Sequence, residues 1–80
     1  MLDDLIECGI QLLNEKKKDI NDNDCSVWNK YVCAVLEHHD YWHFLLSYHR
    51  LQVKVLCLEP PKRLIASIGY LMDCSNMMKG

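Results

Sequence analysis

The 80-residue sequence lacks any long apolar run. Its longest uninterrupted run is Tyr31–Leu36, whereas a membrane span needs about 20 apolar residues, so we expect no span. The N-terminus, Met1–Leu5, is acidic where a secretory signal is basic, and we therefore expect a cytoplasmic protein. With three Gly, two Pro and 50% hydrophobic residues, the composition excludes collagen-like and low-complexity chains. Its length predicts a single domain over residues 1–80.

No C-x-x-C motif is present, which argues against a redox pair and a zinc knuckle. The five Cys are an odd number, and most of them have apolar neighbours, as Cys33 and Cys57 do. A free Cys packs like a small hydrophobic residue, and reduced thiols suit the cytosol. We therefore expect five reduced thiols.

Short catalytic motifs are also absent. The sequence contains no nucleophile elbow, no glycine-rich phosphate loop and no H-E-x-x-H. A thiol dyad built on Cys33 or Cys57 is not favoured, because thiols in apolar runs are inert. We predict a non-enzymatic protein that needs no cofactor.

Charge is distributed unevenly along the chain, although the formal net charge is only −2. Residues 1–40 carry nine acids and four bases, while residues 41–80 carry two acids and five bases. Such asymmetry can steer a protein partner. The basic residues of the second half are too few for a dedicated nucleic-acid binder, so we do not expect nucleic acid as the partner.

The first half of the chain shows two stretches of helical periodicity. Over residues 2–13, apolar residues recur every three or four positions, with acids at the start and Lys16–Lys18 at the end, as the helix dipole favours. A turn rich in Asn and Asp follows at residues 19–24. The second helix is expected to have Asp24 or Ser26 as its N-cap and to be buried on more than one side.

The second half predicts two further helices. Asp40 is expected to cap a third helix over residues 41–58, although residues 53–58 could instead form an edge strand, since short β-branched runs are ambiguous. Pro60 and Pro61 end this element and can open a fourth helix.

In the third helix we expect an inward stripe of six residues, with Arg50 and Lys54 outside it. The six are Trp42, Leu45, Leu46, His49, Val53 and Leu56. In the fourth helix Ala66, Ser67 and Gly69 are small, which predicts the close approach of another backbone. The chain is therefore expected to be all-α, a small bundle or stacked helical hairpins of about four helices.

Landmarks within residues 27–69 resemble a tetratricopeptide helix pair. They are Trp28, His39-Asp40-Tyr41, Leu58-Glu59-Pro60 and Ile68-Gly69. The chain departs from that repeat at His39, which stands where the repeat has Gly, and at Phe44, which stands where it has a small residue. The resemblance implies a helical-hairpin binding module, similar to the small tetratricopeptide chaperones of bacterial type III secretion, which keep an aggregation-prone partner soluble.

All four His lie between residues 38 and 49. On a continuous helix His39 and His43 would share one face and could hold a transition metal, but a site needs a third ligand, and the expected break at Asp40 interrupts that face. Ordinary turn histidines and a pH-responsive surface are the alternatives. We predict no metal site, with His39 and His43 as the candidates if there is one.

Aromatic residues are concentrated within residues 28–48. An 80-residue chain hides only about 60% of its unfolded surface, so we expect some of them to stay exposed, although both Trp could instead fill the core. Exposed aromatic residues beside Arg are typical of protein interfaces. The predicted partner-binding residues are Trp42, Phe44, Leu45 and Tyr48 as apolar anchors, with Arg50 and Lys54 as the charged rim.

The sequence thus predicts a small protein-binding module, an adapter or chaperone that self-associates or joins a hetero-complex. Two alternatives stay open. One is a compact viral or mobile-element regulator that inhibits a host protein or a nucleic-acid complex. The other is a His-based metal-binding protein.

Overall fold

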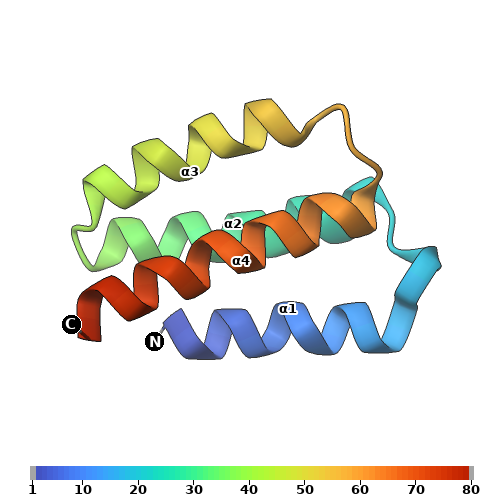
Figure 1. Ribbon diagram of the computed structural model, residues 1–80, viewed down its shortest axis with the longest axis horizontal. Helices are drawn as coiled ribbons and strands as arrows, with labels where there is room; N and C mark the ends of the chain where they lie inside the picture. Colours follow the sequence, from blue (N-terminus) through green and yellow to red (C-terminus); the bar gives the residue numbers. More distant parts are fainter. Residues whose placement is uncertain (1, 80) are drawn as a thin grey trace.

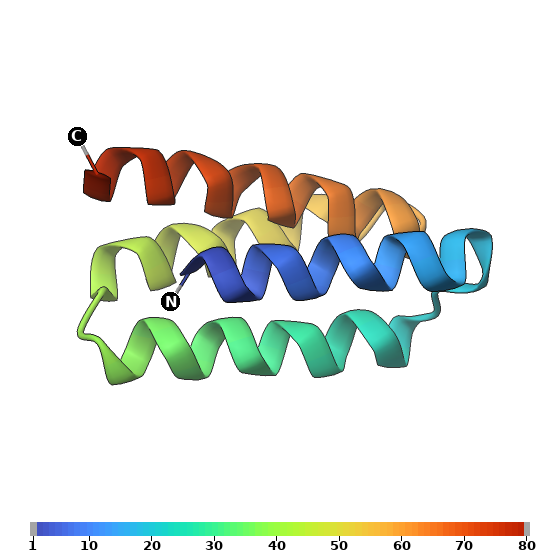
Figure 2. The same ribbon diagram turned by 90° about the horizontal axis from the view of Figure 1, so that it is seen from below.

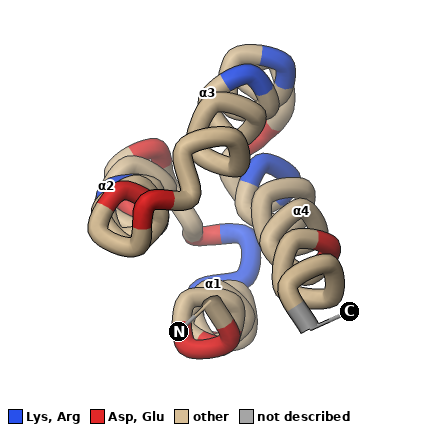
Figure 3. Tube along the Cα trace, turned by 90° about the vertical axis from the view of Figure 1, so that its left-hand side faces the viewer, with Lys and Arg blue, Asp and Glu red and all other residues tan. Residues whose placement is uncertain are grey.

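A computed structural model describes residues 2–79, and within them the protein is all-α, as predicted. Its helices alternate in direction, so that each is antiparallel to the next (Figures 1 and 2). They are α1 (Leu2–Lys16), α2 (Asp22–His38), α3 (Trp42–Val55) and α4 (Pro60–Lys79), with a short 3-10 turn, η1 (Lys17–Asp19), after α1. Seen end-on, the four helices occupy the corners of a bundle, with α1 diagonal to α3 (Figure 3).

α1 buries the stripe that its periodicity predicts, and a glycine in this stripe lets it pack closely. Gly9 faces both α2 and α4: a Cβ at this position would lie 2.8 Å from Ile68 Cδ1 and 3.1 Å from Trp28 Cζ2. Near the N-terminus of α1, the Ser75 hydroxyl of α4 donates a 3.0 Å hydrogen bond to Asp3 Oδ1. α1 therefore contacts α4 both at Gly9 and near its own N-terminus.

Trp28 belongs to the core that α1, α2 and α4 share. Its side chain is only 5% exposed, and its indole Nε1 donates a 3.0 Å hydrogen bond to the Leu5 carbonyl. A buried Trp is stabilised both by the apolar area it hides and by such a partner for its N–H. For this Trp, the interpretation as a core residue is the correct one.

α2 begins earlier than predicted. Its N-cap is Asn21, not Asp24 or Ser26. Asn21 Oδ1 accepts a 2.9 Å hydrogen bond from the Asp24 backbone, and Asp24 Oδ2 accepts one of 3.2 Å in return, which makes a capping box. The hydrogen bond from Lys16 to Asp24, together with that from the Asn21 backbone, lowers the pKa of this carboxyl.

α3 also begins differently from the prediction. Its N-cap is Tyr41, which makes no side-chain capping bond, whereas Asp40 adopts a left-handed conformation with φ of 59°. The expected Asp40 cap is therefore wrong, because this residue is used to reverse the chain, and Asp tolerates that conformation better than most residues. At its other end α3 stops at Val55 and a turn follows, so residues 53–58 do not form a strand.

α2 and α4 each bury one face only. Val27 and Tyr31 of α2 are exposed, so the expected burial of this helix on more than one side is wrong. In α4, Ser67 is buried, but a Cβ added at Gly69 would have no atom within 4 Å, so no backbone approaches closely there. A mid-helix glycine costs about 1 kcal/mol relative to Ala. The packing around Gly69 does not account for that cost.

Candidate protein-binding surface

α3 carries apolar side chains on both of its sides, and the buried side is not the predicted one. Leu45, Tyr48 and Val55 are the buried residues of this helix. Of the six residues expected to face inward, only Leu45 does so. The exposed five are Trp42, Leu46, His49, Val53 and Leu56.

These five residues form what we call the outer stripe of α3. They are separated by four, three, four and three positions, which is the heptad spacing by which one helix packs along another. The exposed fractions of Trp42, Leu46, Val53 and Leu56 are 51, 59, 70 and 67%. Scattered exposed apolar residues are ordinary, but here four of them lie in one row, two on each side of His49.

The charged residues of α3 itself are all basic. Residues 41–58 contain no Asp or Glu, and Arg50 and Lys54 are both exposed on this helix. Figure 3 shows acidic positions on α1 and α2 instead. A partner that covered the outer stripe would therefore meet a basic flank on α3.

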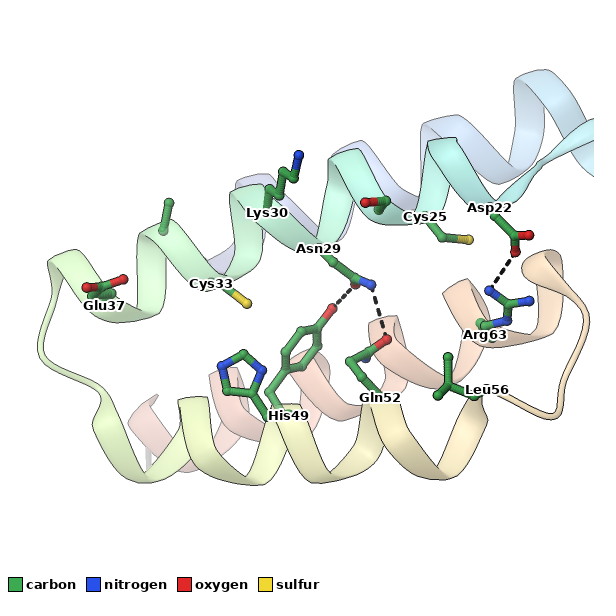
Figure 4. Close-up of a pocket in the computed structure, with 13 residues that line it drawn as sticks. Asp22, Cys25, Asn29, Lys30, Cys33, Glu37, His49, Gln52, Leu56 and Arg63 are labelled. Atoms are coloured by element: carbon green, nitrogen blue, oxygen red, sulfur yellow. Dashed lines mark hydrogen bonds and ion pairs between the residues drawn. The ribbon is translucent and has the colours of Figure 1, made fainter.

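A groove with a volume of about 560 Å³ runs between α2 and α3, beside the outer stripe (Figure 4). His49 and Leu56 of the stripe help to line the α3 side, while Lys30 and Glu37 lie on the α2 side. A groove bordered by an apolar row is the shape that accepts an amphipathic helix.

The groove is crossed by a chain of hydrogen bonds that links α2, α3 and α4. The Tyr48 hydroxyl donates to Asn29 Oδ1, and Asn29 Nδ2 donates to Gln52 Oε1 at 3.2 Å. Gln52 Nε2 in turn donates to Ser67 Oγ at 2.8 Å. Burial raises the pKa of Tyr48, so this hydroxyl stays a donor at neutral pH. Because these side chains are hydrogen-bonded to one another, this row of hydrogen bonds holds α2, α3 and α4 together.

Arg63 of α4 lies at one end of the groove and is already engaged. Its Nη1 lies 2.7 Å from Asp22 Oδ1, and its Nε donates a 2.8 Å hydrogen bond to the Leu58 carbonyl. An ion pair with so exposed a carboxylate adds little to stability. Arg63 is therefore held in place by its own chain.

The thiols at the groove are packed. All five Cys are unpaired, as predicted, and Cys25 and Cys33 help to line the groove. Burial raises the pKa of both thiols and of Cys74, and Cys25 Sγ lies 3.4 Å from the Pro60 carbonyl. A raised pKa keeps more of a thiol in its less reactive, protonated form.

The predicted partner-binding residues are divided between surface and core. Trp42, Arg50 and Lys54 are exposed, Phe44 is half-buried against the core, and Leu45 and Tyr48 are buried. The last two cannot anchor a partner while the bundle is intact.

Sequence reasoning did not assign Leu46, Val53 and Leu56 to the surface. The signal that identifies them is their heptad spacing with Trp42, which fits an outward stripe as well as an inward one.

The histidines lie around the turn between α2 and α3 and along α3. His39 is the C-cap of α2 and His43 lies within α3, so the helix break interrupts the face that they were expected to share. All four are exposed, His49 included. Within residues 2–79, no group of three or more His, Cys, Asp or Glu is placed to hold a metal ion.

Comparison of the chain with protein-family models, curated proteins and solved structures found no match. None of the helices described is both long enough and apolar enough to span a membrane. The tetratricopeptide resemblance stays a prediction.

Proposed function

We propose that the protein is a non-enzymatic protein-binding module, an adapter or chaperone, and that the outer stripe of α3 is its contact surface. The observation that carries this proposal is the heptad-spaced row of exposed apolar side chains. Burying one such side chain fully contributes about 1.5–3 kcal/mol. Four of them in one row supply much of the free energy that offsets the cost of association.

The partner proposed for this surface is an amphipathic helix with an acidic flank. Apolar residues at heptad spacing pack best against another helix. The basic residues Arg50 and Lys54 beside them favour a partner helix that carries acidic residues next to its apolar ones. A second copy of α3 suits the surface less well. A two-fold axis at His49, the middle of the stripe, would bring the two Arg50 side chains together, and like charges in close contact are unfavourable.

A chaperone role follows from the same chemistry. An aggregation-prone protein exposes apolar helices before it folds or assembles, and the outer stripe offers such a helix a matching apolar row. The tetratricopeptide resemblance points to the same kind of role. No specific observation favours the viral regulator or the metal-binding protein over this proposal.

Site-specific photocrosslinking in the native host tests the proposed function. A photoreactive amino acid placed at Leu46 is expected to form a discrete adduct with one partner, whereas the same group at exposed Lys18 of η1 is not. Val53→Glu, introduced beside the crosslinker, is expected to abolish the adduct because it places a carboxylate in the apolar row. The proposal is wrong if position 46 yields no adduct, or if both positions yield the same products.

A further inference from the structure

We propose that the side of the bundle formed by α1 and α4 pairs with a second copy of this chain. Three residues of α4, Ile65, Gly69 and Met72, are exposed and spaced four and three apart, so they share one face of that helix. Ile10 of α1 is exposed on the face that also carries Ile6. We call these four residues the α1–α4 face.

The two helices leave a shallow hollow at this face. Its volume is about 300 Å³, and its lining includes Ile6 and Met72. Apolar side chains thus stand on both sides of a depression into which a neighbouring side chain could pack. A lone exposed Met needs no explanation, but Met72 borders a recess whose lining also includes Asp3, Ser75 and Asn76.

Gly69 is the independent observation that points to a closely packed partner. It lies in the middle of α4, its backbone is helical, and a Cβ added to it would meet no atom within 4 Å. Gly9 shows the opposite case, since its missing side chain makes room for Ile68 and Trp28. Gly69 lowers the stability of its own helix, and no neighbour inside the fold needs the space it leaves. Its presence is explained if that space admits the backbone of a partner helix.

The charges beside Gly69 favour a second copy as the partner. Lys62 and Asp73 are both exposed, on either side of Gly69 along α4. When two α4 helices cross antiparallel at Gly69, Lys62 of each copy approaches the end that carries Asp73 of the other. The surface is therefore complementary to itself, as a two-fold interface requires. The outer stripe of α3, which has no acidic residue, is not.

The proposal does not depend on the function of α3. The groove beside the outer stripe lies between α2 and α3, whereas the hollow described above lies between α1 and α4. These two pairs of helices form opposite sides of the bundle (Figure 3). A dimer built through the α1–α4 face leaves both outer stripes open and so presents two docking surfaces, which increases avidity for a paired or repeated partner.

Sedimentation equilibrium of the purified full chain over a wide concentration range tests the pairing. The wild-type protein is expected to form a dimer. Gly69→Leu is expected to lower its association constant at least about a hundredfold, because two added side chains keep the helices apart. Ala34→Leu, which adds similar bulk at an exposed position of α2, is the matched control and is expected to leave the constant unchanged.

Charge reversal identifies the partner arrangement. Lys62→Glu and Asp73→Lys are each expected to weaken the dimer severalfold, as exposed ion pairs do when broken, and the double variant is expected to restore it. Circular dichroism melting at low concentration checks that each variant folds.

A wild-type protein that stays monomeric up to millimolar concentration overturns the proposal. So does a dimer that is insensitive to Gly69→Leu, or one whose charge-reversed double variant is no better than the singles. A dimer lost through Leu46→Glu instead would place the interface on α3 and would likewise contradict it.

Discussion

The two tryptophans of this small bundle lie in opposite surroundings. Trp28 is buried where α1, α2 and α4 meet, and its N–H is bonded to the Leu5 carbonyl. Trp42 begins the outer stripe of α3, and half of its surface is open to solvent. The same side chain thus stabilises the fold in one region and is available for contact in the other. The difference distinguishes residues that stabilise the bundle from residues that are exposed on its surface.

Removing the two indoles should separate these roles most clearly. Trp28→Ala is expected to lower the free energy of unfolding by about 3–5 kcal/mol, because it opens a cavity and removes the hydrogen bond from the indole to the Leu5 carbonyl. Trp42→Ala should change it by less than about 0.5 kcal/mol. Urea denaturation of both variants measures the contrast, and equal losses would contradict it.

The hydrogen-bonded chain under the groove should have the next largest effect. Asn29→Ala removes the acceptor of the Tyr48 hydroxyl and the donor to Gln52, and is expected to cost about 1–3 kcal/mol. Ser26→Ala, at an exposed position on the same side of α2, serves as the control and should be neutral. If the two variants unfold at the same urea concentration, the hydrogen bonds of Asn29 do not stabilise the packing of the helices.

Alkaline pH should lower the free energy of unfolding, because two tyrosines of the bundle are at least partly buried. Burial raises the pKa of Tyr48 well above its ordinary value of 10 and raises that of Tyr70 to about 12. Below pH 10 both tyrosines are protonated in the folded and the unfolded chain. Above it the unfolded chain loses its protons first, so stability falls as the pH rises. Tyr48 alone accounts for about 1.4 kcal/mol at pH 11.

Urea denaturation at neutral pH and at pH 11 measures this loss against Tyr48→Phe. The titration of the thiols also lowers stability, but it is common to both proteins and cancels in the comparison. The variant should lose less stability than the wild type. An identical decline in both would mean that the Tyr48 hydroxyl is not buried.

The two helical glycines should respond to Ala in opposite directions, each by about 1 kcal/mol. At Gly9 the new Cβ would press on Ile68 and Trp28, and overpacking by about 1–3 kcal/mol exceeds the gain in helix propensity. At Gly69 the methyl group meets nothing, so the gain of about 1 kcal/mol remains. Urea denaturation of dilute protein measures both, and a stabilising Gly9→Ala would contradict the tight packing of α1.

How far the sequence could predict this structure depends on how many sides of a helix are apolar. α1 has one apolar stripe, so its burial was predictable residue by residue. α3 has two, and periodicity does not say which one meets the rest of the bundle. Tyr48 was therefore expected at the surface and Leu46, Val53 and Leu56 inside, while Trp42 and Leu45 were expected both in the inward stripe and among the partner anchors.

Helix termini were predicted less well, because capping is a local competition. Asn21, Asp24 and Ser26 can all cap a helix, and the reciprocal bonds of Asn21 with Asp24 decide between them. Asp40 has the side chain of a cap, but the reversal of the chain requires it in a left-handed conformation. The charge asymmetry of the two halves, by contrast, was visible in the sequence, and in the fold it becomes the basic flank of α3.

Collisional quenching of single-tryptophan proteins tests the central claim most directly, namely that the outer stripe is open while the core indole is closed. The Trp28→Phe variant retains only Trp42, which is 51% exposed, and its fluorescence at low protein concentration should be readily quenched by acrylamide. The Trp42→Phe variant retains only Trp28 and should be quenched weakly until urea unfolds it. A shielded Trp42 in the folded, dilute protein would contradict the account, because the apolar row of α3 would then already be covered.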